Sequence, residues 1–269
     1  MSEPPSLTEA PAHRDRIAVV ALALLVAGAA WLFTVEQARQ MDAMDAAMWR
    51  DMAMSMNGMA PSWTPLDALL VFVMWSAMMA AMMVPGASPM IAAFATINRR
   101  RRERRALYVP TAVFLAGYLA VWAGFSALAT LAQYLLQKAG LVSTMMQSAS
   151  YGFSAALFLA AGLYQFSPLK QRCLNLCRSP DGFILSEWRD GAVGAVIMGV
   201  RHGLFCLGCC AALMLLLFAV AVMDLRWVAA LTILVTAEKL LPGAKFWRAA
   251  IGLALIITGA AFAVLALQA

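Results

Sequence analysis

The chain contains 269 residues, of which 63% are hydrophobic and only 13% are charged, and its mean hydropathy is +0.78. This composition leaves little sequence for a soluble domain and is typical of an integral membrane protein. The formal net charge of +6 comes largely from basic segments that flank hydrophobic runs, so it does not indicate a nucleic-acid partner. We therefore expect an all-α fold with one transmembrane domain over residues 17–269.

Seven hydrophobic runs predict a polytopic bundle of about seven transmembrane helices, or six if the short sixth run does not cross the membrane. They lie at residues 17–35, 66–84, 108–131, 149–166, 192–222, 227–241 and 246–267. The first run continues through aromatic residues beyond its small residues, which favours an uncleaved anchor over a cleaved signal peptide. Residues 1–16 contain three prolines and are expected to form a disordered cytosolic tail.

Lysine and arginine are distributed unequally between the two sets of predicted loops. If the N-terminus is in the cytosol, 15 of the 20 basic residues lie on the cytosolic side. This orientation follows the rule that loops rich in lysine and arginine remain in the cytosol. The block from Arg99 to Arg105 is interpreted as a topology anchor against anionic lipid headgroups. The sequence therefore predicts a multi-pass protein of the bacterial inner membrane.

The predicted periplasmic loop at residues 36–64 is rich in methionine. It holds seven methionines, and no Leu, Ile, Val or Phe occurs between Gln37 and Pro61. Met52, Met54 and Met56 alternate, so an extended segment would place their thioethers on one side. Thioether sulfur is a soft ligand that favours Cu(I). The alternative is an amphipathic surface helix in which methionine is only an apolar filler.

The second hydrophobic run continues the methionine pattern. Met74, Met78 and Met82 are four residues apart and share one helix face, with Met79 and Met83 in a second row beside it. Such rows could pass a soft ion along the helix, although close packing of helices would use the same residues. Two prolines, at positions 85 and 89, are expected to end or kink this helix and to free carbonyls that need other partners.

The fifth run combines several metal-ligating side chains. At about 100° per residue, Met198, His202, Cys206 and Cys209 fall within a sector of about 80°, and Cys210 lies about 40° further round. One straight helix cannot close a tetrahedral site with this set, so further ligands would come from another helix, most simply the methionine row. The alternatives are inert buried cysteines and a structural histidine. The neighbouring arginine, at position 201, can be an interfacial residue.

A second pair of cysteines lies on the predicted cytosolic side. Cys173 and Cys177 are four residues apart and would face the same way on a short helix, flanked by two arginines that favour thiolate. The pair could accept or deliver a soft ion, and a structural or redox pair is equally compatible with this spacing. Glu238 and Lys239, at the end of the sixth run, are expected either to pair with this basic loop or to mark the membrane interface.

Four motifs carry a resemblance to a known family. They are Met74-Trp75 with Ala81-Met82-Met83-x-Pro85; Tyr164-Gln-x-x-Pro168-Leu169-Lys170-x-x-Cys173-x-x-x-Cys177-Arg178-x-Pro180; Gly203-x-x-Cys206-x-Gly208-Cys209-Cys210-x-x-Leu213-Met214; and Glu238-Lys239. The chain resembles bacterial multi-pass proteins of a domain-of-unknown-function family, described as predicted metal-binding integral membrane proteins. The resemblance implies a membrane location and a bound metal but supplies no catalytic roles. Ala211 stands where a tryptophan often follows the cysteine pair.

These observations predict a membrane protein that binds a soft metal ion, Cu(I) in preference to zinc, and that acts in copper transfer or homeostasis. The ligands are expected among His202, the five cysteines and the methionines of the loop and second run. An accessory subunit of a membrane complex, working with a membrane or periplasmic partner, is the main alternative. A membrane thiol-disulfide oxidoreductase is another. No catalytic residue and no nucleic-acid site are predicted.

Overall fold

The computed structural model describes residues 21, 25–40, 63–103, 109–142, 150–220, 222, 224–241 and 244–268. Throughout these residues the regular structure is helical and no strand is found, which confirms the all-α prediction. A helix at residues 25–40 precedes the labelled elements. The others are α2 (Pro65–Glu103), α3 (Thr111–Lys138), α4 (Tyr151–Gln165), α5 (Pro168–Arg178), α6 (Pro180–Glu187), α7 (Gly191–Met214), α8 (Leu217–Val220), α9 (Leu225–Leu240) and α10 (Ala244–Gln268).

Four helical stretches of the described chain are long and apolar enough to cross a membrane. They are Pro65–Asn98, Thr111–Lys138, Gly191–Val220 and Phe246–Gln268. A fifth crossing would require α4 and α5 to act together, although they are bent by 64° at their junction. The predicted sixth span corresponds to α9, which has only 16 residues. Most of residues 17–24 lie outside the described part of the chain, so the first predicted span is only partly described.

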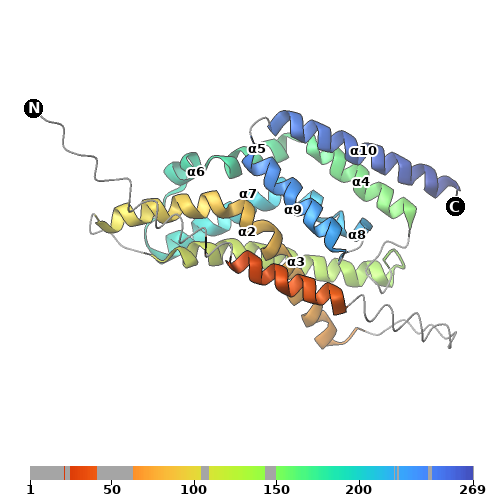
Figure 1. Ribbon diagram of the computed structural model, residues 1–269, viewed down its shortest axis with the longest axis horizontal. Helices are drawn as coiled ribbons and strands as arrows, with labels where there is room; N and C mark the ends of the chain where they lie inside the picture. Colours follow the sequence, from red (N-terminus) through yellow and green to blue (C-terminus); the bar gives the residue numbers. More distant parts are fainter. Residues whose placement is uncertain are drawn as a thin grey trace, which may run out of the picture.

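The helices form an elongated bundle in which α7 is the central element (Figure 1). It packs mainly against α3 and α5, while α2 packs against α3 and α9. The outermost pair is α4 with α10, which lie side by side along one flank. Most side chains of α10 that point away from α4 are exposed and apolar, as expected for a helix that faces lipid.

Close contact between α3 and α7 depends on glycine. A Cβ added at Gly199 would lie 2.1 Å from the Phe114 carbonyl oxygen, and one added at Gly117 would lie 2.4 Å from the Val196 carbonyl oxygen. Gly199 and Gly203 are four residues apart on α7. This small-x-x-x-small spacing lets two helix backbones pack closely in a membrane, where the hydrophobic effect does not drive helices together. The two helices are thus held in one register, which positions side chains that project between them.

Helix α2 runs through both of its prolines. The helix therefore does not end at either proline, and Figure 1 shows a change of direction between its two halves, which is the kink predicted as the other alternative. Pro89 has no N–H with which to reach the carbonyl of Pro85, and the Ser88 hydroxyl donates to that carbonyl instead, at 2.7 Å. The expected replacement partner for a freed carbonyl is present.

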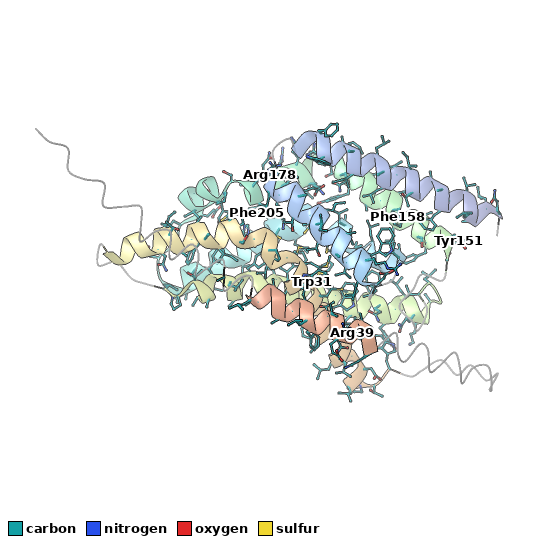
Figure 2. The ribbon with its side chains drawn as sticks, in the orientation of Figure 1. Trp31, Arg39, Tyr151, Phe158, Arg178 and Phe205 are labelled. Atoms are coloured by element: carbon teal, nitrogen blue, oxygen red, sulfur yellow. The ribbon has the colours of Figure 1, made fainter. Side chains whose placement is uncertain are left out.

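An arginine of α5 contacts the end of α9. Figure 2 shows Arg178 at the end where α5 meets α9, and Tyr151 at the opposite end, where α4 begins. Arg178 donates to the carbonyl of Glu238 at 3.2 Å and also to the carbonyl of Leu241. These carbonyls close α9, whose terminal dipole favours a cation. The arginine thereby ties α5 to the end of α9.

Candidate metal centre

The ligand-bearing face of α7 points into the bundle. Met198, His202, Cys206, Cys209 and Cys210 are all buried, which is the face expected from their helical angles. The charged residue next to this set turns away. The Arg201 side chain is 41% exposed and pairs with Glu187, so it lies at the edge of the bundle and not among the sulfur atoms.

Helix α5 folds back onto α7 and brings the second cysteine pair with it. The break after α4 follows from Pro168, which occupies the first turn of α5, and from Ser167, whose hydroxyl accepts from the N–H of Leu169 at 3.1 Å. The returning helix places Cys173 against Gly208, where an added Cβ would lie 2.7 Å from the Cys173 sulfur. The glycine leaves the room that this sulfur atom occupies.

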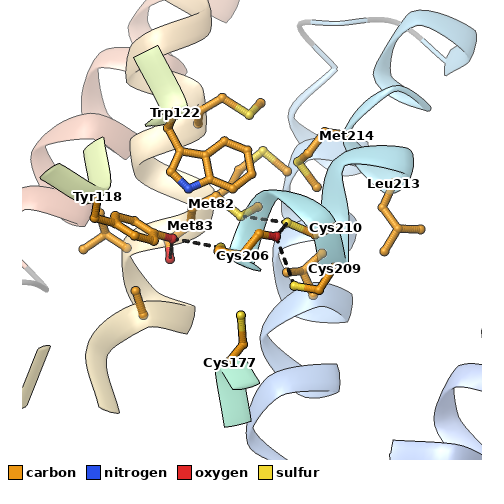
Figure 3. Packing of buried hydrophobic residues seen from close by; sticks show 14 of the residues in the cluster. Met82, Met83, Tyr118, Trp122, Cys177, Cys206, Cys209, Cys210, Leu213 and Met214 are labelled. Carbon is orange, nitrogen blue, oxygen red and sulfur yellow. Dashed lines mark hydrogen bonds between the residues drawn. The ribbon is translucent and has the colours of Figure 1, made fainter. Parts of the chain in front are cut away.

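All five cysteines of the chain are therefore buried, free and close to one another. The thiol of Cys177 interacts with that of Cys209, and Figure 3 shows it pointing from α5 towards Cys206 and Cys209. We call this set the cysteine cluster: Cys173, Cys177, Cys206, Cys209 and Cys210. Two cysteine-containing segments that are about 30 residues apart in the sequence thus lie against each other.

Two polar groups from other helices approach the sulfur of Cys206. The ammonium of Lys239 on α9 donates to this sulfur at 3.1 Å, and the hydroxyl of Tyr118 on α3 lies 3.1 Å from it. The same hydroxyl donates to the carbonyl of Met83 at 3.2 Å. All four residues are buried. Cys206 is thus the point where α2, α3, α7 and α9 meet.

The other two thiols on α7 bond to their own backbone. Cys209 and Cys210 donate to the carbonyl of Cys206, at 3.0 Å and 2.8 Å. Among the described residues, no three His, Cys, Asp or Glu side chains are disposed to hold one metal ion. To serve as ligands, these two sulfurs would have to lose their protons and turn away from the helix backbone.

Thioether sulfur lies beside the thiols. The Cys210 sulfur is 3.7 Å from that of Met83, and Figure 3 shows Met82 and Met83 reaching from α2 towards Cys210. Met74 and Met78 are buried further along the same helix. The sulfur contact between α2 and α7 thus uses Met83, from the second row of methionines predicted for this helix. That α2 supplies metal ligands to α7 stays a prediction.

His202 lies in an aromatic environment one turn from Cys206. Its ring centroid is 5.5 Å from that of Tyr118, 5.6 Å from that of Phe183 and 6.2 Å from that of Phe114. The ring is buried, and its Nδ1 has no hydrogen-bond partner in the part of the chain that the structure describes. A buried nitrogen of this kind is unusual in proteins.

A buried ion pair borders the cysteine cluster. The ammonium of Lys170 on α5 lies 2.7 Å from Glu238 Oε2 on α9, and both side chains are buried. Of the two alternatives predicted for Glu238, pairing with the basic loop before the fifth run is the one observed. Lys239 behaves differently from its neighbour, because it reaches the thiol of Cys206 rather than the basic loop.

Sequence reasoning missed several residues of this site. Nothing in the sequence distinguishes Tyr118 from the other aromatic residues of the predicted spans. For Lys239 the sequence predicts only a place at the membrane interface or a contact with the basic loop. The available signal was a lysine near the end of the mostly apolar segment that forms α9, since a cation at that depth needs a partner. Met52, Met54 and Met56 lie outside the described residues, so their predicted role rests on the sequence.

A helical bundle with apolar membrane-length helices and a buried set of thiols and thioethers has the features of a protein that handles soft metal ions. The comparisons with known proteins agree with this class. The chain belongs to the family described as PpoB2 copper chaperone, whose model matches residues 72–262. That match contains the whole cysteine cluster. It begins after the methionine-rich loop at residues 36–64 and does not include it. No curated protein and no solved structure matches the chain.

Proposed function

We propose that this chain is a multi-pass protein of the bacterial inner membrane that binds Cu(I) as cargo and passes it on in copper homeostasis. The observation that carries the proposal is the convergence of five free cysteines from α5 and α7 with Met83 from α2. Soft thiolate and thioether ligands favour Cu(I), whereas hard cations prefer oxygen. Membership of a copper chaperone family supports the same metal.

The order of the sulfur groups along the molecule supports a path. Met74, Met78 and Met82 follow α2 from its Pro65 end towards the cysteine cluster, with Met83 against Cys210. In the proposed orientation, Met52, Met54 and Met56 collect Cu(I) in the periplasm, the α2 row conducts it, and the cysteines hold it near the cytosolic side. His202 is proposed as an additional ligand through Nδ1.

Cargo binding requires a rearrangement at the thiols. Cys209 and Cys210 are bonded to the Cys206 carbonyl, so an entering ion must displace two modest hydrogen bonds, each worth about 1 kcal/mol. Replacing these contacts with metal bonds requires that the thiols release their protons to solvent or a nearby base and that their side chains rotate, while α7 itself remains helical. A site that opens by rotamer changes can also release its ion, which a carrier requires.

Metal analysis of the full chain, purified in detergent under reducing conditions, tests the proposal. After exposure to Cu(I), we expect stoichiometric copper in the wild type and its loss in the triple variant C206S/C209S/C210S. Serine retains the size and hydrogen bonding of cysteine but not its soft sulfur. A control variant, S76C/C206S/C209S/C210S, adds a thiol in α2, away from the replaced positions on α7, and should not recover binding.

Two outcomes would overturn this function. A wild-type protein that binds no copper is not a carrier, and the accessory-subunit alternative would then gain support. Thiols of the cluster that cycle between reduced and oxidised states in membranes, without bound metal, would instead indicate a thiol-disulfide oxidoreductase. Trapping free thiols with a maleimide in intact cells distinguishes these cases.

A further inference from the structure

Lys239 is a cation placed among thiols rather than carboxylates. Its ammonium donates to the Cys206 sulfur at 3.1 Å, and Cys209 and Cys210 are buried about one turn from Cys206 on α7. Within the described residues it has no carboxylate at ion-pair distance, because the adjacent Glu238 is paired with Lys170. A buried, uncompensated lysine is costly, and a negative cluster beside it would offset that cost.

The backbone of α2 makes room for this lysine. A Cβ added at Gly86 would lie 3.1 Å from Lys239 Cδ and 3.3 Å from Nζ, so the side chain crosses α2 at the one position without a Cβ between Pro85 and Ala87. The lysine stem is therefore directed past the bend in α2 towards Cys206. Its approach to the sulfur depends on contacts with two other helices.

The charge of the loaded site depends on the metal. For any given number of thiolate ligands, a site holding Cu(I) is one unit more negative than the same site holding Zn(II). A fixed positive charge about 3 Å from one of those sulfurs consequently stabilises the Cu(I) form more than the Zn(II) form. In a buried site of low dielectric constant, the difference exceeds that of a surface pair. Methionine and neutral histidine ligands do not alter this argument, since they carry no charge.

We infer that Lys239 is a specificity-determining residue of the cysteine cluster, which favours monovalent Cu(I) over divalent ions such as Zn(II). The inference rests on the proposed function, because it presumes that the cluster binds metal through its thiolates. It goes further by giving selectivity to a residue that is not itself a ligand. Sulfur softness alone does not separate Cu(I) from zinc, since zinc also takes thiolate sites.

The test is a competition between Cu(I) and Zn(II) for the full chain in detergent, with anaerobic buffered metal solutions. In K239Q, the ratio of Cu(I) affinity to Zn(II) affinity should fall by at least about tenfold, or about 1.4 kcal/mol. K239R keeps the positive charge and should stay within about threefold of the wild-type ratio. K138Q removes an exposed lysine at the end of α3 and should leave the ratio unchanged.

A second variant moves the ammonium without removing it. G86A places a methyl group against Lys239 and should lower the Cu(I) to Zn(II) ratio, whereas G124A, at a glycine with open space around it, should not. This pair keeps the inference testable if K239Q does not fold. Circular dichroism and elution volume establish which variants are folded.

The possible results distinguish the role of Lys239 in selectivity from the proposed Cu(I) binding on which it rests. If wild-type protein binds no Cu(I), or binding survives loss of the cluster thiols, the proposed function fails. If the wild type binds Cu(I) through the cluster but folded K239Q and G86A keep the wild-type ratio, only the role of Lys239 is overturned. A purely structural role would weaken both metals equally and leave the ratio unchanged.

Discussion

At the residue scale, the cost of a charge away from water explains how Lys170 and Glu238 are arranged. They pair at 2.7 Å in the interior of the bundle. Neither is far from the cysteine cluster, because Lys170 precedes Cys173 by less than one turn on α5 and Glu238 precedes Lys239 on α9. The pair therefore joins the helix that supplies two cysteines to the helix that supplies the cation.

Breaking this pair on one side should be more harmful than removing it. K170M leaves the Glu238 carboxylate buried without a counter-charge, and we expect a loss of about 3–5 kcal/mol in the free energy of unfolding. The double variant K170M/E238M removes both charges and should recover most of that loss. Unfolding in mixed detergent and SDS, followed by circular dichroism, measures both values. If the single and double variants lose the same free energy of unfolding, the loss comes from altered packing and not from an unpaired buried carboxylate, and this prediction is wrong.

His202 offers a direct distinction between a structural and a ligating histidine. H202F fills the space between Phe114, Tyr118 and Phe183 but removes Nδ1, whereas H202A also leaves a cavity. Changes to groups that merely support a metal ligand cost about 10–100-fold in affinity, so loss of a ligand should lower Cu(I) affinity at least tenfold in H202F, with little change in melting temperature.

The measurement is Cu(I) affinity by competition with a colorimetric chelator, beside thermal unfolding of the same samples. A folded H202F protein with wild-type affinity would assign His202 to the aromatic packing of α3 and α7, and would remove it from the proposed ligands. H202A serves as the control for packing, since it should melt at a lower temperature whichever role is correct.

At the element scale, the contact of α3 with α7 decides whether Tyr118 can reach Cys206. G199A would place a methyl group within 2.1 Å of the Phe114 carbonyl oxygen and force the helices apart. We expect G199A to lower the free energy of unfolding by about 1–3 kcal/mol or more and to weaken Cu(I) binding. G124A on the same helix pair meets open space and should stay within about 0.5 kcal/mol of wild type. Equal stability of the two variants would contradict this account.

The sequence predicted individual helices better than their association. The inward face of α7 was predictable, because Met198, His202, Cys206 and Cys209 lie within a narrow sector of any α-helix. The approach of Cys173 to Gly208 was not, since it depends on a 64° bend between α4 and α5. Nor could helical periodicity place Lys239 on Cys206, because that contact joins residues 33 positions apart in the chain and requires the passage beside Gly86.

At the scale of the whole molecule, the sulfur groups occupy different depths of one bundle. The methionines of α2 extend from near its first turns to the bend at Pro85, and the cysteines lie beside that bend. Helix α10, whose exposed side chains are mostly apolar, packs mainly against α4. The sulfur-bearing residues and the exposed apolar face of α10 therefore belong to different parts of the bundle.

The methionine-rich loop should influence the rate of loading rather than the capacity of the cluster. It lies outside residues 72–262, which match the copper chaperone family, and it precedes the α2 methionines in the chain. In M52L/M54L/M56L the thioethers are lost but the apolar character is kept. We expect an equal final copper content and an initial rate of Cu(I) uptake into spheroplasts that is several-fold lower, because fewer soft ligands concentrate the ion at the entrance.

The matched control is M145L/M146L, which changes two methionines of another predicted periplasmic segment without touching the loop. Both variants remove thioether sulfur from the same side of the membrane, so a difference between them isolates the position of the methionines. An unchanged uptake rate in the loop variant would assign its methionines to packing against the membrane surface. A lower final copper content would place part of the storage site in the loop itself, since the cysteine cluster is intact in this variant.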